Sequence, residues 1–424
     1  MSPIEKEEWG WAASAASLRP LVAGLRMLAS LRRNRAFINP GLELETWDVA
    51  ADGAHNSNTD LIHFKGSFYL AHQISPWHFG SEESRLVVRR SADARRWEKV
   101  AEFEASGEEL RDPKFAVIGD RLFLYVLRNR AWDPEPYTTA YTCSEDGTSW
   151  GPLVDIRPEG WLFWSPETID SATWYVPAYW REHGRSALLK SSDGVEWSWV
   201  SEIYEGERND ETAIEFLPDG RMIATLRLEG SGQMRGDPQA STLIAVASPP
   251  YEEWSYARSR VTRLDGPCLF AHGGEVFAAG RYQADRLPGL SEQGSVFSRK
   301  RTSLFLVRED GLTYLSDLPS SGDTSYAGAV IQGDVAYVSY YTSPIDKDYP
   351  WLIGMLSRTD IRMARISLPS LARLANSPPA ARTGSISPWV KLLPVLGIGA
   401  LGVVGVRRAL RRLCARQSEG ASRG

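Results

Sequence analysis

Short apolar runs alternate with polar turns along most of the chain, and the pattern repeats in six units. Each unit opens with two apolar stretches joined by a turn, at residues 60–73, 112–128, 167–180, 211–227, 265–281 and 323–341. The turns carry Gly or Asp, as in Lys65-Gly66, Gly119-Asp120 and Gly333-Asp334, which is ordinary β-hairpin chemistry. A second hairpin follows, so the pattern predicts antiparallel strands in groups of four.

A short motif marks the second hairpin of the first three units. Ser-x-Asp-x-x-x-Trp occurs at residues 91–97, 144–150 and 191–197, with starts 53 and 47 residues apart. In such a turn Asp and Ser bond the backbone, and Trp fills the apolar space beneath. A period near fifty residues indicates one supersecondary unit that buries its faces against its neighbours.

These units predict an all-β fold, a six-bladed β-propeller. The sixth unit has only three clear strands after Asp323, whereas a strand at 43–49 precedes the first unit without a partner. We expect that strand to become the outer strand of the sixth blade and to join the ends of the ring. A β-helix or two sandwiches would use the same strands, but neither explains the two-hairpin period.

Both ends differ from the repeats, which divides the chain into four parts. Residues 1–36 mix apolar residues with arginines, a pattern typical of an amphipathic helix. The propeller is expected over 43–370, a Pro- and Ser-containing linker over 371–388, and a hydrophobic helix with a basic tail over 389–424.

The C-terminal part indicates membrane contact. Residues 392–406 carry no charge but fall short of the roughly twenty residues that cross a bilayer, and five arginines follow them. We expect contact through residues 389–412 and attachment at the cytoplasmic face. A propeller outside the cell is the alternative topology, and a helix docked on the folded domain is the alternative to a membrane role.

Composition narrows the classes of function. The net charge of −5 gives no support to a nucleic-acid partner. Three cysteines do not form a disulfide framework. The six histidines lack metal-ligand spacing with cysteine, so we predict neither a metal nor a cofactor.

Polar residues converge at one end of the predicted channel, because first strands start and second strands end at the same face. The first strands begin at or beside Asp60, Asp112, Glu167, Glu211, Asp265 and Asp323. The second strands end at His72, Arg128, Trp180, Arg227, Arg281 and Tyr341. Such a cluster suits binding and protonation of a polar substrate, and paired carboxylates serve glycosidic cleavage. Capping of strand ends is the structural alternative for each acid.

Three segments resemble the sialidase superfamily. Asn209-Asp210-Glu211 with Leu226-Arg227 is similar to its fourth-blade segment, and Gly280-Arg281-Tyr282 and Asp323-Thr324-Ser325-Tyr326 resemble segments of the next two blades. The resemblance implies Tyr326 as nucleophile and Glu211 as its base. It also implies that Arg227 and Arg281 bind a substrate carboxylate. An anionic sugar repels a carboxylate nucleophile, whereas it does not repel a neutral phenol.

The first blade departs from the superfamily at two places. Asn58-Thr59-Asp60 stands where the superfamily has Arg-Ile-Pro, and the loop 75–84, where it has an acid/base Asp, contains His78 but no Asp. We therefore expect Asp60 or Asp112 as acid/base. The remaining substrate-binding candidates are Arg111, Arg128, Glu167 and His72.

Three functions follow from these observations. The leading one is a sialidase-like glycoside hydrolase that acts on a terminal acidic or otherwise polar sugar. The second is a glycosidase or lyase that uses only carboxylates, namely Asp60, Asp112, Glu167 and Glu211; Arg111-Asp112-Pro113 resembles propeller glycosidases of that kind. The third is a catalytically inert propeller that binds a glycan or a protein at a membrane.

Overall fold

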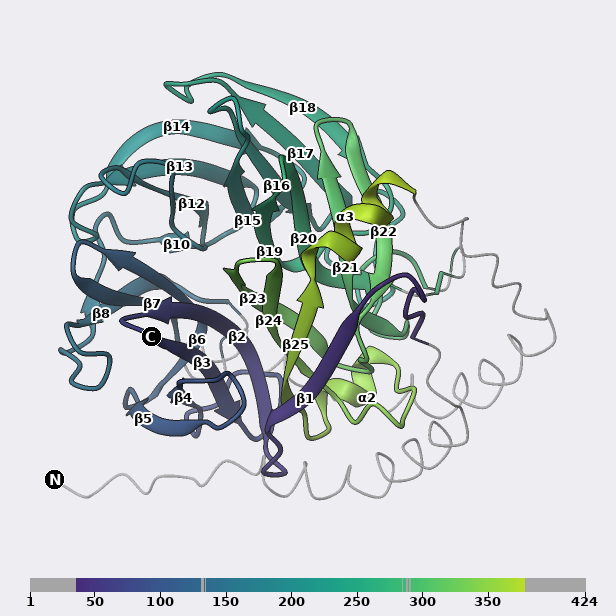
Figure 1. The fold of residues 1–424 in the computed structure, drawn as a ribbon, viewed down its shortest axis with the longest axis horizontal. Helices are drawn as coiled ribbons and strands as arrows, with labels where there is room; N and C mark the ends of the chain where they lie inside the picture. The colour runs from purple at the N-terminus through teal and green to yellow at the C-terminus, as the bar shows by residue number, and fades with distance from the viewer. Residues whose placement is uncertain are drawn as a thin grey trace, which may run out of the picture. The chain divides into compact units, whose positions relative to one another are not determined.

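The protein is a ring of six antiparallel sheets (Figure 1). The computed structural model describes residues 36–377, apart from 131, 132, 134, 284, 287, 288 and 290. Strands of neighbouring blades contact one another around the ring, and apolar side chains from facing sheets fill the space between them. The predicted six-bladed propeller is therefore confirmed.

The first three blades contain the following strands, from the channel outward. Blade one is β2 (His55–Phe64), β3 (Ser67–Ser75), β4 (Arg85–Ser91) and β5 (Glu98–Phe103). Blade two is β6 (Glu108–Ile118), β7 (Arg121–Arg130), β8 (Thr138–Ser144) and β9 (Val154–Asp155). Blade three has a divided inner strand, and consists of β10 (Trp161–Phe163), β11 (Glu167–Thr168), β12 (Trp174–Trp180), β13 (Arg185–Ser191) and β14 (Ser198–Glu205).

The other three blades complete the ring. Blade four is β15 (Asn209–Phe216), β16 (Met222–Leu228), β17 (Ser241–Ala247) and β18 (Trp254–Ser259). Blade five is β19 (Asp265–His272), β20 (Glu275–Gln283), β21 (Lys300–Arg308) and β22 (Gly311–Asp317). Blade six is β23 (Thr324–Gln332), β24 (Val335–Thr342), β25 (Asp360–Ser367) and β1 (Leu44–Ala50).

The ring closes as predicted, because the first strand of the chain completes the last blade. β1 pairs antiparallel with β25, from Leu44 opposite Ile366 to Ala50 opposite Ile361 (Figure 1). The ends of the propeller are thus joined by backbone hydrogen bonds, and Trp47 on β1 donates from Nε1 to Ala94 O of blade one at 2.9 Å.

The three Ser-x-Asp turns have the same internal hydrogen bonds. The Asp carboxylate accepts from two successive backbone N–H groups, at 2.8 and 2.9 Å for Asp93, 2.7 and 2.7 Å for Asp146, and 2.8 and 2.9 Å for Asp193. Tyr69 of blade one donates to Asp146 O, and Tyr125 of blade two donates to Gly194 O. Each turn therefore also fastens its own blade to the preceding one.

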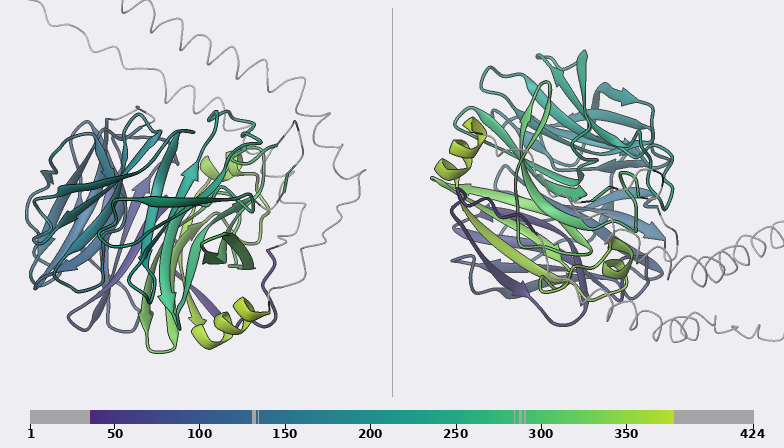
Figure 2. Two further views of the ribbon diagram at one scale, coloured as in Figure 1. Left: turned by 90° about the horizontal axis from the view of Figure 1, so that it is seen from above. Right: turned by 90° about the vertical axis from the view of Figure 1, so that its right-hand side faces the viewer.

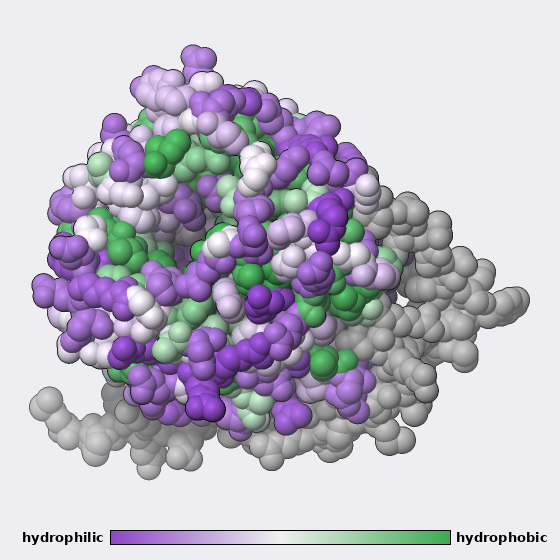
Figure 3. All heavy atoms as spheres, in the orientation of Figure 1, coloured by the Kyte–Doolittle hydropathy of each residue, from purple (hydrophilic) through white to green (hydrophobic). Residues whose placement is uncertain are grey.

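Two helices lie on opposite faces of the ring (Figure 2). α2 (Trp351–Met355) belongs to the connection between β24 and β25. α3 (Leu368–Asn376) follows β25 and packs its buried leucines against blades five and six. Residues 371–376 of the predicted linker are therefore helical, because Leu371 and Leu374 lie on an apolar helix face. Figure 3 shows the face that carries α3, where most side chains are hydrophilic.

The predicted terminal helices, at 1–36 and 389–424, lie outside the described residues and stay predictions. Within residues 36–377, as far as they are described, no helix is both long enough and apolar enough to cross a membrane.

Candidate active site

One structural device positions the site: a β-bulge at the same place in the inner strand of five blades. The pairing register shifts by one residue between 57 and 60, 111 and 114, 210 and 213, 265 and 268, and 325 and 328. The first residue within each bulge has positive φ: Asn58 (50°), Asp112 (47°), Glu211 (29°), Gly266 (60°) and Tyr326 (49°). Bulges redirect side chains, and positive φ in non-glycine residues marks strain that is typical of functional sites.

Bulge residues of four blades line a cavity of about 160 Å³, and Trp351 of α2 lines the same cavity. Its lining comes from all six blades and consists of Asn58, His78, Arg111, Asp112, Glu135, Pro136, Tyr179, His183, Glu211, Arg227, Glu229, Arg263, Arg281, Tyr326 and Trp351. Four arginines, four acids, two histidines and three aromatic residues therefore face a space of monosaccharide size.

Tyr326 and Glu211 form the central pair of the cavity. The Tyr326 hydroxyl donates a short hydrogen bond to Glu211 Oε1, and the Gly266 N–H donates to Glu211 Oε2 at 2.7 Å. Burial, reinforced by the charge of Glu211, raises the pKa of Tyr326 well above its usual value. The phenol therefore keeps its proton at rest, while the carboxylate that can accept the proton is already in place.

Arg227 is fixed by acids of its own blade. It forms a two-pronged ion pair with Asp210, with Nε 2.6 Å from Oδ1, and its Nη1 lies 2.9 Å from Glu211 Oε1. Burial disfavours the guanidinium charge, but Asp210, Glu211 and Glu229 hold the pKa of Arg227 well above its usual value. Arg227 thus stays charged and cannot swing away from the cavity.

Arg281 and Arg263 share acids of blades five and six. Arg263 grips both oxygens of Asp265, at 2.5 and 2.9 Å. Arg281 donates to Thr324 O at 2.8 Å and to the Tyr341 hydroxyl at 2.9 Å, and lies 3.3 Å from Asp323. The fourth cavity arginine, Arg111, is held by buried Glu109 at 3.0 Å. Each guanidinium is therefore oriented from behind by a buried acid.

Asp112 is the cavity carboxyl group with a free oxygen. It is buried, and its Oδ1 has no hydrogen-bond partner among the described residues. Burial raises the pKa of Asp112 to about 6. Attraction to Arg111 and Lys114 lowers this pKa, whereas repulsion from Glu211 raises it further. A carboxyl group in this state can donate a proton or bind a sugar hydroxyl.

The structure does not bring Asp60 to the cavity. Its Oδ2 accepts from the Phe115 N–H at 2.6 Å, which ties blade one to blade two, and the bulge position of blade one belongs to Asn58 instead. Glu167 is also absent from the lining. The inner strand of blade three is interrupted after Phe163, and Trp164 lies in the interruption with its Nε1 bonded to Pro267 O at 2.8 Å.

His72 and Arg128 face away from the cavity because each is one residue out of register. In blade four, Arg227 lies opposite the residue just before the bulge, Asp210. The residue at the place of Arg227 is Gln73 in blade one and Leu127 in blade two, one position from His72 and Arg128. Adjacent strand residues point to opposite faces. His72 is buried beside Arg89, and desolvation together with that charge lowers its pKa to about 3. Arg128 pairs with Glu108 and Asp155 outside the cavity.

Several cavity residues were not expected from the sequence. Arg263 was detectable, since it stands two residues before Asp265. His183 lies in the turn after β12, between Glu135, Asp210 and Glu229. Burial opposes its charge, but Asp210, Glu135 and Glu229 raise the pKa of His183 to about 10. Trp351 comes from α2, and no sequence repeat predicts its position.

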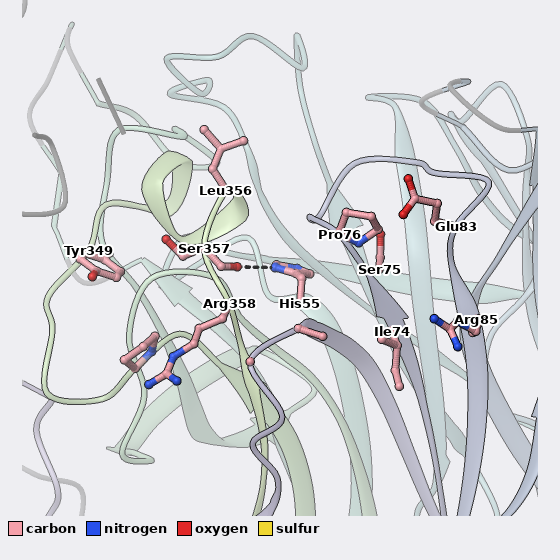
Figure 4. Close-up of a pocket in the computed structure, with 13 residues that line it drawn as sticks. His55, Ile74, Ser75, Pro76, Glu83, Arg85, Tyr349, Leu356, Ser357 and Arg358 are labelled. Carbon is pink, nitrogen blue, oxygen red and sulfur yellow. Dashed lines mark hydrogen bonds between the residues drawn. The ribbon is translucent and has the colours of Figure 1, made fainter. Parts of the chain in front are cut away.

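A larger groove of about 660 Å³ lies between blades one and six (Figure 4). Pro76, Leu356 and Ser357 line this groove, whereas His78 and Trp351, from the same two segments, line the cavity. His55 donates from Nδ1 to Ser357 O at 2.7 Å, and its Nε2 lies 3.3 Å from Asp323 Oδ2.

Among the residues that the structure describes, two groups have a spacing that could hold a metal ion: His55, His78 and Asp323, and His183, Asp210 and Glu229. Each group contains an acid that already pairs with a guanidinium, Asp323 with Arg281 and Asp210 with Arg227. An arginine so close opposes a cation, so neither donor set fits a metal well.

Comparison with known proteins places the fold among glycosidase propellers. No family model and no curated protein matches the chain. Among solved structures, a phage phi92 endosialidase matches with a TM-score of 0.58 at 11% identity, over 77% of this chain and 69% of that protein. A Trypanosoma rangeli sialidase bound to sialic acid gives 0.55 at 14% identity, over 81% and 61%. A Penicillium chrysogenum α-L-arabinanase bound to arabinobiose gives 0.50 at 14%, over 78% and 97%.

The protein spans 61% of the length of the trypanosomal sialidase. At these identities the likeness concerns the fold. The chain is thus a six-bladed β-propeller with the architecture that sialidases share with other glycoside hydrolases.

Proposed function

We propose that the protein is a sialidase-like glycoside hydrolase that cleaves a terminal sugar with acidic or other polar substituents. The observation that carries the proposal is the hydrogen bond between the buried Tyr326 hydroxyl and Glu211, beneath Arg227 and Arg281. Phenylalanine and glutamine would fill the same space, so packing alone does not explain why this buried pair is a tyrosine and an acid. The cavity volume of about 160 Å³ suits a single sugar ring rather than a chain.

In the proposed reaction Tyr326 Oη attacks the anomeric carbon while its proton passes to Glu211. The bond to the leaving oxygen breaks, and a covalent glycosyl-tyrosine forms. Water then cleaves this intermediate, and the phenol recovers its proton from Glu211. Arg227 and Arg281 bind the anionic or polar substituent of the sugar, and their positive charge also favours a phenolate that develops during the reaction.

The test is Tyr326→Phe, which removes one hydroxyl from the cavity. We expect turnover of 4-methylumbelliferyl glycosides to fall by at least about 10³-fold, because nothing else in the cavity replaces the nucleophile. The substrates are the reporters of N-acetylneuraminic acid, of a hexuronic acid and of a neutral hexose. Tyr340→Phe is the matched control. The Tyr340 hydroxyl bonds Pro319 O at 3.1 Å and interacts with Arg362, and neither residue lines the cavity, so activity should persist.

One observation favours a second candidate, a glycosidase that uses only carboxylates. Each cavity arginine already has its own buried acid, and Asp112 offers an unpartnered oxygen near Glu211. Such an enzyme would accept neutral sugars, survive Tyr326→Phe and lose activity in Asp112→Asn. The two variants together therefore separate the candidates.

A further inference from the structure

Cleavage of a glycosidic bond requires a proton for the departing oxygen. The sugar fills the cavity, so the departing group must leave through the open face, and the proton donor must stand there. We propose that His78, held by Asp323, is the acid/base residue of this site. The inference rests on the proposed hydrolase function and adds a residue and a role to it.

His78 stands at the mouth of the cavity with one ring nitrogen free. It belongs to the loop between β3 and β4, lines the cavity, and has a side chain that is 22% exposed. Its Nδ1 lies 2.7 Å from Asp323 Oδ2, and its backbone N–H donates to Met355 O at 3.0 Å. No described residue bonds its Nε2, so that atom can exchange protons with a ligand.

Asp323 determines which nitrogen is free. The carboxylate is fully buried, and its Oδ1 accepts from Trp351 Nε1 at 2.7 Å and from the Tyr341 hydroxyl at 3.0 Å. Burial favours protonation, but His78, His55 and Arg281 hold the pKa of Asp323 well below its usual value. An ionised Asp323 requires a proton on His78 Nδ1, which directs Nε2 away from Asp323.

Other titratable groups of the cavity fit this role less well. His183 is at the opposite side, but its two nitrogens face three carboxylates within 3.3 Å. Asp112 belongs to an inner strand and is only 7% exposed, beside Glu211. It is therefore placed to contact a ring hydroxyl at the bottom of the cavity rather than a group that leaves through the mouth.

The proposed reaction has two steps. In the first, protonated His78 gives its Nε2 proton to the departing oxygen as the bond from that oxygen to the anomeric carbon breaks, while Tyr326 bonds the carbon and its own proton moves to Glu211. In the second, neutral His78 takes a proton from water. The resulting hydroxyl bonds the anomeric carbon, and Tyr326 leaves as a phenol with the proton from Glu211.

The test compares two leaving groups on the sugar that the wild type cleaves. A 4-methylumbelliferyl group departs readily, whereas a methoxy group needs a proton. We expect His78→Gln to lower kcat/KM for the methyl glycoside by about 10²–10⁴-fold and to affect the aryl glycoside far less. Asp323→Asn, a change in the positioning residue, should show the same dependence on leaving group. His63→Gln, on the exposed side of β2, should match the wild type for both substrates.

The proposal would be overturned if His78→Gln lowered kcat/KM equally for both substrates, or for neither. If only Asp112→Asn showed the dependence on leaving group, Asp112 would be the acid/base residue instead. A fluorinated glycosyl fluoride of the same sugar tests the proposed hydrolase function separately from the role of His78, because fluoride departs without a proton. Mass gain on Tyr326 in both wild type and His78→Gln supports the nucleophile independently of His78. No mass gain in the wild type, or no cleavage of any reporter, rejects both proposals.

Discussion

Gly266 occupies the bulge position of blade five because no side chain fits there. A Cβ built on Gly266 would lie 2.7 Å from Tyr326 Cδ2, 2.8 Å from Tyr326 Cγ and 2.9 Å from the Tyr326 backbone nitrogen. The ring and the backbone of the proposed nucleophile are thus both within overlap distance. We predict that Gly266→Ala displaces Tyr326 from Glu211, and also moves the Gly266 N–H that bonds Glu211.

The expected magnitude has two parts. Gly266 has a φ of +60°, where alanine costs about 1 kcal/mol relative to glycine. Overlap with Tyr326 adds about 1–3 kcal/mol, the usual cost of an overpacked core. A catalytic group displaced by about 1 Å loses on the order of 10²-fold in rate, so kcat/KM should fall by about this factor while the folded protein loses about 2–4 kcal/mol of stability.

Gly273 provides a matched control for this substitution. It lies in the β19–β20 turn of the same blade, also has a φ of +60°, and a Cβ on it would meet no atom within 4 Å. Gly273→Ala should therefore show the backbone cost alone, with unchanged kcat/KM. Urea unfolding and reporter hydrolysis measure the two quantities. Equal stability and equal activity of the two variants would refute the steric reasoning.

Two further predictions concern burial. The pKa of Asp112 is about 6 in the folded protein and near 3.8 in an unfolded chain. The folded state therefore binds a proton at Asp112 more tightly than the unfolded state. The stability from this proton binding is lost as the pH rises from 4 through 6. Relative to Asp112→Asn, the wild type should lose about 2.4 kcal/mol of unfolding free energy between pH 4 and 7, and a constant difference in urea unfolding would contradict this. Trp197, 7% exposed and packed against Phe163, should cost about 3–5 kcal/mol on change to Ala, whereas Trp199, 48% exposed, should cost much less; equal melting temperatures would show that the turn is not a packing element.

The repeat pattern was sufficient to predict the blades and the convergence of charged residues at one end of the channel. Strands of one blade start and end at the same faces as those of the next, so residues near corresponding strand ends must converge. This reasoning brought Glu211, Arg227 and Arg281 together. Tyr326, which lies 115 residues from Glu211 in the sequence, was expected only from the resemblance to the sialidase superfamily. Ring closure by β1 followed from counting strands.

The errors arose where one residue of register matters. The bulge inserts an extra residue in the inner strands of five blades, and no hydrophobic pattern reveals which residue it redirects. Asn58 rather than Asp60 therefore faces the cavity. On the second strands, Gln73 and Leu127 hold the register position of Arg227, so alternation of side chains turns His72 and Arg128 the other way.

Loop residues were beyond the reach of a repeat argument for a different reason. His78 meets Asp323 across 245 residues, and Trp351 reaches the same carboxylate from a five-residue helix in an irregular connection. Such contacts depend on the path of loops that differ between blades, so a period shared by the blades contains no information about them.

The chemistry of this propeller is concentrated in one row of positions that repeat between blades. Blades four and five place an Asp just before the bulge and an Arg opposite it, in the pairs Asp210–Arg227 and Asp265–Arg281. Blade two differs, with Arg111 before its bulge and the uncharged Leu127 opposite. Since these residues change while the strand pairing stays the same, the scaffold tolerates different charges in this row. Each buried acid then fixes an arginine in advance, so the cavity need not reorganise when charge develops on a substrate.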